Sequence, residues 1–198
     1  MPTLSLKIIS KILSLLFLSA IIAEAHTGKG LANGFTSGFL HPIFGLDHVV
    51  AMVAVGLWGA FLGAPAIWLL PVMFPIIMAL GGVLGVAGVP LPGVEIGIAL
   101  SAIVLGIMVA AAARLPLFIA AILVAIFAIF HGHAHGAELP QAANPLAYSL
   151  GFVLSTGLLH LSGITLGLLD RFSKGKLAIR ILGGVITLIG LGFLTHIL

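Results

Sequence analysis

Residues 48–94 read HVVAMVAVGLWGAFLGAPAIWLLPVMFPIIMALGGVLGVAGVPLPGV, and none of these 47 residues between Asp47 and Glu95 is Asp, Glu, Lys or Arg. A helix needs about 20 apolar residues to cross the hydrocarbon core of a bilayer, which is about 30 Å thick. The stretch is therefore long enough for two membrane spans. Gly63-Ala64-Pro65 lies between them and is typical of a turn.

The composition of the whole chain agrees with a membrane protein. Of its 198 residues, 61% are hydrophobic and 7% are charged, whereas about a quarter of the residues of a soluble domain are charged. A water-soluble globular domain, a disordered chain and a nucleic-acid-binding protein are therefore excluded. The chain contains no cysteine, which excludes disulfides, thiolate metal sites and thiol nucleophiles.

The positions of Gly, Pro and charged residues predict an all-α, polytopic membrane helix bundle that forms a single transmembrane domain over residues 26–198. The six expected helices cover residues 40–62, 67–87, 94–113, 115–133, 146–169 and 177–198. Small residues four apart would let these helices pack closely. Such pairs are Gly59 and Gly63, Gly81 and Gly85, and Gly132 and Gly136.

The first 25 residues have the pattern of a cleavable signal peptide. Lys7 and Lys11 are its basic region, residues 12–22 are an apolar run of eleven, and Ala23-Glu24-Ala25 is a small-residue cleavage site. Eleven apolar residues are too few to span a bilayer. We therefore expect residues 1–25 to be removed, so that the mature chain begins at His26 on the outer side of the membrane.

The basic residues predict the orientation, because Lys and Arg collect in cytoplasmic loops. The loops after the third and the fifth expected helix contain Arg114, Arg171, Lys174, Lys176 and Arg180. With these loops inside, both mature termini lie outside. The sequence pI of about 9.7 is then mostly a consequence of topology. Trp58 and Trp68 flank the turn at residues 63–65 and are expected to be interfacial anchors.

Polar residues inside the spans indicate where function lies, because ionisable groups in a bilayer are costly unless they are paired or hydrated. His41 and His48 are seven residues apart, so a straight helix places them on one face, about 10.5 Å apart along its axis. Asp47 lies beside His48 and could ligate a metal or hydrogen-bond a neighbouring imidazole. The alternative for this helix is a core histidine paired with Asp47.

A second polar group ends the fourth expected helix. His131 and His135 are four residues apart and Glu138 follows three residues later, so one helical face carries all three, whereas His133 points elsewhere. In the topology above, these residues lie at the same outer level as the polar residues of the first helix and Glu95 at the start of the third. Imidazole and carboxylate ligands suit divalent Zn, Ni, Co, Fe or Cu.

These residues resemble the two signatures of the HupE/UreJ family of nickel and cobalt permeases. Residues 41–48 (HPIFGLDH) are similar to its first-helix signature HPxxGxDH, and residues 130–138 (FHGHAHGAE) fit its fourth-helix pattern FHGxAHGxE. The resemblance covers essentially the whole chain. It implies uptake of Ni²⁺ or Co²⁺ across the bacterial cytoplasmic membrane, with membrane lipid around the protein, no enzymatic activity and no prosthetic group. The metal ligands it carries over are His41, Asp47, His48, Glu95, His131, His135 and Glu138.

Other functions stay open at this point. An intramembrane zinc hydrolase or di-iron oxygenase would need a nucleophile, an activated water or an electron donor, and Asp47 has no obvious serine partner in its own helix. A metal sensor or an assembly partner without transport is the third class. His160 follows Ser155 and Thr156 in the fifth expected helix, and it is either an inner relay site below the outer residues or a packing histidine.

Overall fold

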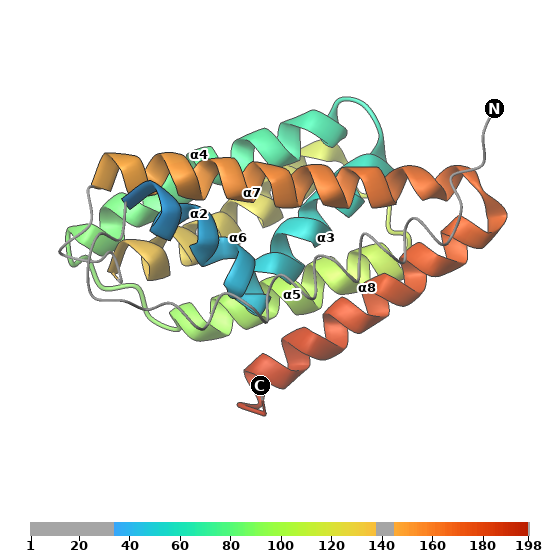
Figure 1. Ribbon diagram of the computed structural model, residues 1–198. Coiled ribbons are helices and arrows are strands. Elements are labelled where there is room, and N and C mark those ends of the chain that lie inside the picture. The colour runs from blue at the N-terminus through green and yellow to red at the C-terminus, as the bar shows by residue number, and fades with distance from the viewer. Residues whose placement is uncertain (1–33, 138–144, 198) are drawn as a thin grey trace. The chain divides into compact units, whose positions relative to one another are not determined.

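The computed structural model describes residues 34–137 and 145–197. These residues form helices and no strand, so the all-α prediction is confirmed. The helices are α2 (Gly34–Phe44), α3 (Leu46–Leu62), α4 (Ala66–Val86), α5 (Val94–Ala110), α6 (Leu117–Ala137), α7 (Pro145–Gly167), the 3₁₀ turn η2 (Leu168–Arg171) and α8 (Ser173–Leu194) (Figure 1). The predictions for residues 1–25, His26 and Glu138 lie outside the described residues.

The first expected helix, residues 40–62, is wrong as a single straight helix. α2 and α3 are separated at Gly45, and the bend between them is 78°. Gly45 leaves the helical conformation, with φ −80° and ψ 104°. Pro42 lies inside α2 and cannot donate a backbone hydrogen bond. Because prolines and glycines are the usual causes of sharp kinks, the residues of the predicted signature themselves explain the break.

Four elements are long and apolar enough to cross a membrane, namely α4, α6, α8 and the continuous segment of α7 and η2. α2 and α3 also qualify when they are taken together as one broken span. The apolar helix α5 has 17 residues, or about 25 Å at 1.5 Å per residue. The described chain is therefore a polytopic membrane bundle, while the number of six spans stays a prediction.

Glycines set the distance between the helices. Gly81 and Gly85 of α4 face Gly132 and Gly136 of α6, and a Cβ on any of them would overlap backbone atoms of the opposite helix. This close approach of α4 and α6 confirms the role predicted for both glycine pairs. α3 packs on α7 in the same way, because a Cβ on Gly56 or Gly163 would overlap a carbonyl of the other helix.

The pair Gly59 and Gly63 has a different role from the one predicted. A Cβ on Gly59 would lie 3.1 Å from the carbonyl oxygen of Ala66, which is at the start of the next helix in the chain. Gly63 has φ +81° and open space around it, and this left-handed backbone is one that glycine adopts readily. These two glycines therefore permit the tight turn between α3 and α4.

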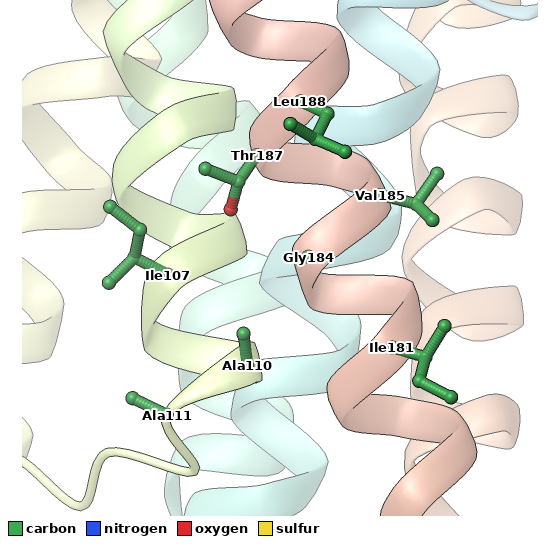
Figure 2. Close-up of a pocket in the computed structure, with 8 residues that line it drawn as sticks. All are labelled: Ile107, Ala110, Ala111, Ile181, Gly184, Val185, Thr187 and Leu188. Carbon is green, nitrogen blue, oxygen red and sulfur yellow. The ribbon is translucent and has the colours of Figure 1, made fainter.

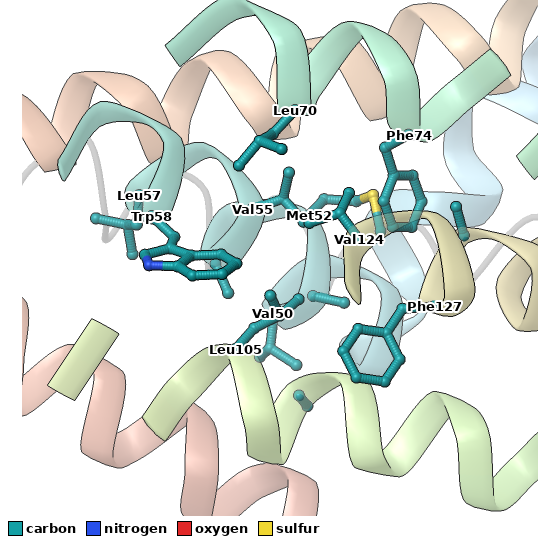
Figure 3. Packing of buried hydrophobic residues seen from close by; sticks show 14 of the residues in the cluster. Val50, Met52, Val55, Leu57, Trp58, Leu70, Phe74, Leu105, Val124 and Phe127 are labelled. Carbon is teal, nitrogen blue, oxygen red and sulfur yellow. The ribbon is translucent and has the colours of Figure 1, made fainter. Parts of the chain in front are cut away.

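The buried core surrounds α3 and contains Met52, Trp58 and Phe74, which have no exposed surface (Figure 3). The Trp58 indole N–H donates a hydrogen bond to the Ala113 carbonyl, 2.9 Å away. The prediction that Trp58 is an interfacial anchor is therefore wrong, because a backbone carbonyl from another part of the chain satisfies its N–H inside the protein. Trp68 is 59% exposed.

The outside of the bundle carries large apolar side chains, such as Val72, Phe118 and Leu188, as a protein surrounded by lipid requires. A groove of about 700 Å³ lies between α5 and α8 (Figure 2). Apolar residues and Thr187 line it, and the Thr187 hydroxyl already donates to the Gly183 carbonyl at 2.9 Å. Since no titratable side chain lines this groove, it lacks the ligands of a metal site.

Candidate metal centre

Three histidines from α2, α3 and α6 form a hydrogen-bonded chain. His41 Nε2 lies 3.0 Å from His135 Nδ1, and His135 Nε2 lies 3.1 Å from His48 Nδ1. A neutral imidazole has one N–H donor and one acceptor nitrogen. Each neutral ring in the chain can therefore donate a hydrogen bond to one neighbour and accept one from the other. The bend at Gly45 makes this possible, because it lets residues on both sides of the break reach the same imidazole.

His131 completes a group of four histidines, which we call the histidine cluster (His41, His48, His131 and His135). Its ring lies 5.4 Å from the His48 ring, between centroids, and none of its surface is exposed. His131 Nδ1 is 3.0 Å from the Phe127 carbonyl of its own helix, and a carbonyl can only accept. The proton is therefore on Nδ1, and Nε2 carries a lone pair.

This protonation state suits a metal ligand. A histidine that ligates through one nitrogen usually donates its other N–H to a carbonyl or carboxylate, which fixes the orientation of the ring. The Phe127 carbonyl does this for His131, while His131 Nε2 is buried and has no hydrogen-bond partner. Burying an unpartnered polar atom costs stability, so a bound ion at Nε2 would relieve that cost.

Sequence reasoning missed the residues of α7 that border the histidine cluster. His48 Nε2 is 3.5 Å from Thr156 Oγ1, a long hydrogen bond between two buried side chains. The Phe152 ring lies 4.7 Å from the His135 ring and 5.2 Å from the His48 ring, between centroids. No motif on α7 marks these positions, since their role follows from the packing of α7 on α2 and α3.

The predicted carboxylates are placed differently from the histidines. Asp47 is half-buried in the first turn of α3, directly before His48. Glu95 is exposed in the first turn of α5 and makes no hydrogen bond or ion pair with the four histidines within the described residues. Glu138 lies outside those residues. The structure thus brings Asp47 close to the histidine cluster and does not bring Glu95 into contact with it.

His133 behaves as the helical spacing predicts. It lies between His131 and His135 in sequence, but its Nε2 is 2.7 Å from the Val89 carbonyl, in the connection between α4 and α5. His133 therefore points away from the histidine cluster.

Among the described residues, no three His, Asp or Glu side chains already direct their donor atoms to one point. His135 uses both ring nitrogens for its two histidine neighbours, so it can bind an ion only if one of these hydrogen bonds breaks. The separations of 3.0 and 3.1 Å are those of hydrogen bonds between imidazoles, so the described structure corresponds to an ion-free form of the histidine cluster.

A pocket of about 530 Å³ lies between α4, α6 and α7 and reaches the histidine cluster. His135, Tyr148 and Phe152 line it together with apolar residues of α4. The pocket gives the cluster space next to His135, the histidine at the centre of the hydrogen-bonded chain.

Comparisons with known proteins identify the family to which the chain belongs. The family described as "HupE / UreJ protein" matches residues 13–193. The chain is also similar to "Protein HupE" of Rhizobium leguminosarum bv. viciae, with 47% identity over 187 residues that cover 93% of this chain and 97% of the relative. No solved structure matches the chain at a significant level. The chain belongs to the HupE/UreJ family.

Proposed function

We propose that this HupE/UreJ family member is a permease that moves Ni²⁺ or Co²⁺ inward across the bacterial cytoplasmic membrane. The observation that carries the proposal is the histidine cluster, in which three different helices contribute imidazoles and His131 Nε2 has a free lone pair. The proposed ligands are His41, Asp47, His48, Glu95, His131, His135 and Glu138.

The donor set supports a divalent transition metal as the transported ion. Imidazole and carboxylate groups suit Ni²⁺, Co²⁺ and Zn²⁺, whereas retention of Cu⁺ favours thiolates. The chain has no cysteine, and Met52, one turn after His48, is packed in the apolar core. Membership in the HupE/UreJ family supports nickel or cobalt among the divalent ions.

The hydrogen bonds between the histidines supply a way to release the ion. A buried polar atom that loses its partner is costly, and a ligand set that simply lost its metal would have several such atoms. In the histidine cluster, the imidazoles bond to one another instead. The ion-free form is thereby stabilised, so binding stays weak enough for an ion to leave.

The membrane potential is sufficient to drive uptake. The proposed topology has the histidine cluster toward the outside and the basic loops inside, and the sequence contains no ATP-binding motif. An inside-negative potential is worth about 2.3 kcal/mol per elementary charge per 100 mV, so a dication gains roughly twice that amount.

The enzyme alternative finds less support in the site. A hydrolase needs a nucleophile that substrate can reach, and Thr156, the hydroxyl-bearing residue of α7 that contacts His48 of the cluster, is fully buried. An ion without its hydration shell is far smaller than an ester or a peptide. Burial of this kind is therefore compatible with an ion path and not with acyl transfer.

The direct test is uptake of radiolabelled Ni²⁺ and Co²⁺ by liposomes that contain the purified protein, with an inside-negative potential imposed. We expect uptake above that of empty liposomes, and we expect each of the two ions to compete with the other more strongly than Zn²⁺ does. Uptake equal to that of empty liposomes for both ions would contradict the proposal.

A further inference from the structure

The described residues contain four buried side-chain nitrogen or oxygen atoms without a hydrogen-bond partner, and all of them lie on α6 and α7. One is His131 Nε2, which belongs to the histidine cluster. The other three are Ser155 Oγ and both ring nitrogens of His160. His160 is 1% exposed, so the lipid and the outer solution do not satisfy its nitrogens.

His160 continues the line of polar residues beyond the histidine cluster. Thr156, whose hydroxyl is 3.5 Å from His48 Nε2, precedes His160 by four residues in α7. Residues four apart share a helical face and differ by about 6 Å in depth. His160 is therefore the next polar side chain below Thr156 on the face of α7 that meets the cluster.

Phe74 of α4 lies between the cluster and His160. Its ring centroid is 5.7 Å from that of His131 and 5.6 Å from that of His160, with an edge-to-face arrangement in both cases. Phe74 itself belongs to the buried apolar cluster around α3 (Figure 3). One aromatic side chain therefore borders two imidazoles, each of which has an unpartnered nitrogen.

The packing of α7 on α3 explains where His160 lies, but it does not explain why the side chain at this position is an imidazole. The His160 carbonyl lies against Gly56 of α3, where a Cβ would overlap it, so the backbone of α7 is held close to α3 at this point. An apolar side chain at position 160 would fill the space without burying two unpartnered nitrogens. A purely structural role for an imidazole here is therefore a poor explanation.

We propose that His160 is an inner binding stage that receives the metal ion after it leaves the histidine cluster. This inference rests on the proposed permease function. The His160 imidazole is a ligand of the same kind as those of the cluster. An ion that moves inward past Phe74 exchanges His48 and His131 for His160, so it does not cross the apolar core without ligands.

The first experiment replaces His160 by Leu and measures uptake, binding and thermal stability. For His160→Leu, we expect Ni²⁺ or Co²⁺ uptake in liposomes at least tenfold below wild type. Equilibrium Ni²⁺ binding to the purified protein in detergent should stay within about threefold of wild type, and the melting temperature should be equal or higher. The control is Ser162→Ala, because the Ser162 hydroxyl already donates to the Leu159 carbonyl at 2.7 Å, and its uptake should equal wild type.

The outcomes separate the two roles of His160. Uptake of wild-type rate by His160→Leu would overturn the inner stage. A lower melting temperature with normal uptake per folded molecule would assign His160 to packing, and this would also overturn it.

A second experiment detects the ion at position 160 without relying on transport. The chain has no cysteine, so His160→Cys introduces a unique thiol. We expect Ni²⁺ to produce near-ultraviolet thiolate-to-nickel absorption in this variant and none in Ser162→Cys. Equal absorption in both variants, or none in either, would overturn the inference.

The two experiments also distinguish failure of this inference from failure of the permease proposal. If wild-type liposomes take up no metal but His160→Cys shows the absorption, the binding stage stands and the permease function fails. If wild-type liposomes take up metal while His160→Leu transports normally, the permease stands and the inner stage fails.

Discussion

His48 and His135 are 87 residues apart in the chain, and a nitrogen–nitrogen hydrogen bond of 3.1 Å joins them. This bond connects α3 with α6. The other ring nitrogen of His135 forms a hydrogen bond with His41. The two signatures that the sequence carries on separate helices therefore meet at one imidazole.

His131 should be required for transport, whereas its neighbour His133 should not. His131→Leu removes the unpartnered Nε2 and keeps a similar volume in the core, so we expect uptake to fall at least tenfold while the amount of folded protein changes little. His133→Ala should transport nearly normally, because His133 bonds to the Val89 carbonyl. Uptake in proteoliposomes and thermal melting check both variants. A normal rate for His131→Leu would remove His131 from the ligand set.

Asp47 should contribute through its charge. Asp47→Asn keeps the shape of the side chain but removes the carboxylate charge next to His48, so we expect uptake to fall at least tenfold. Asp170→Asn is the matched control, because Asp170 also lies in the first turn of a helical element, η2, at the other end of α7. Loss of folded protein in Asp47→Asn, with wild-type uptake per surviving molecule, would show that this carboxylate is structural.

Uptake should weaken as the external solution is made more acidic. A protonated imidazole has no lone pair for a metal. Acid therefore favours protons over metal ions at the histidine cluster, and alkaline solution reverses this. The measurement is Ni²⁺ uptake by proteoliposomes with fixed internal pH and potential. Uptake that does not fall at any acidic pH at which the protein stays folded would argue against histidine ligation.

Gly132→Ala should destabilise the bundle. Its Cβ would overlap the Met78 carbonyl of α4, and overpacking of this kind typically costs about 1–3 kcal/mol. Gly157→Ala is the control, because nothing lies within 4 Å of a Cβ at that position. Thermal melting in detergent should show a lower midpoint for Gly132→Ala and an unchanged or higher one for Gly157→Ala. Equal melting midpoints for the two variants would show that α4 and α6 can move apart to accept the added methyl group at little cost.

The helices and the spacing of His131 and His135 could be predicted because both depend on local sequence. Long apolar runs locate helices, and residues four apart share a helical face. The bend at Gly45 could not be predicted in direction, although Pro42 and Gly45 are visible in the sequence. It depends on the packing of α2 against α7, where Gly38 lies against the Tyr148 carbonyl.

Two other contacts could not be predicted from the sequence, because they also depend on how distant segments pack. The partner of the Trp58 indole is the Ala113 carbonyl, 55 residues away, and the partner of His48 on α7 is 108 residues away. Spacing within one helix carries no information on such contacts. The straight-helix separation of His41 and His48 was wrong because it treated two helices as one.

The glycine contacts divide the helices around the cluster into two tightly joined groups. α4 and α6 form one group, which carries His131 and His135, and α7 joins α2 and α3 in the other, which carries His41 and His48. Every hydrogen bond between imidazoles in the cluster crosses from one group to the other. The cluster therefore links the two groups of helices. Any movement of one group relative to the other would change both imidazole contacts at once.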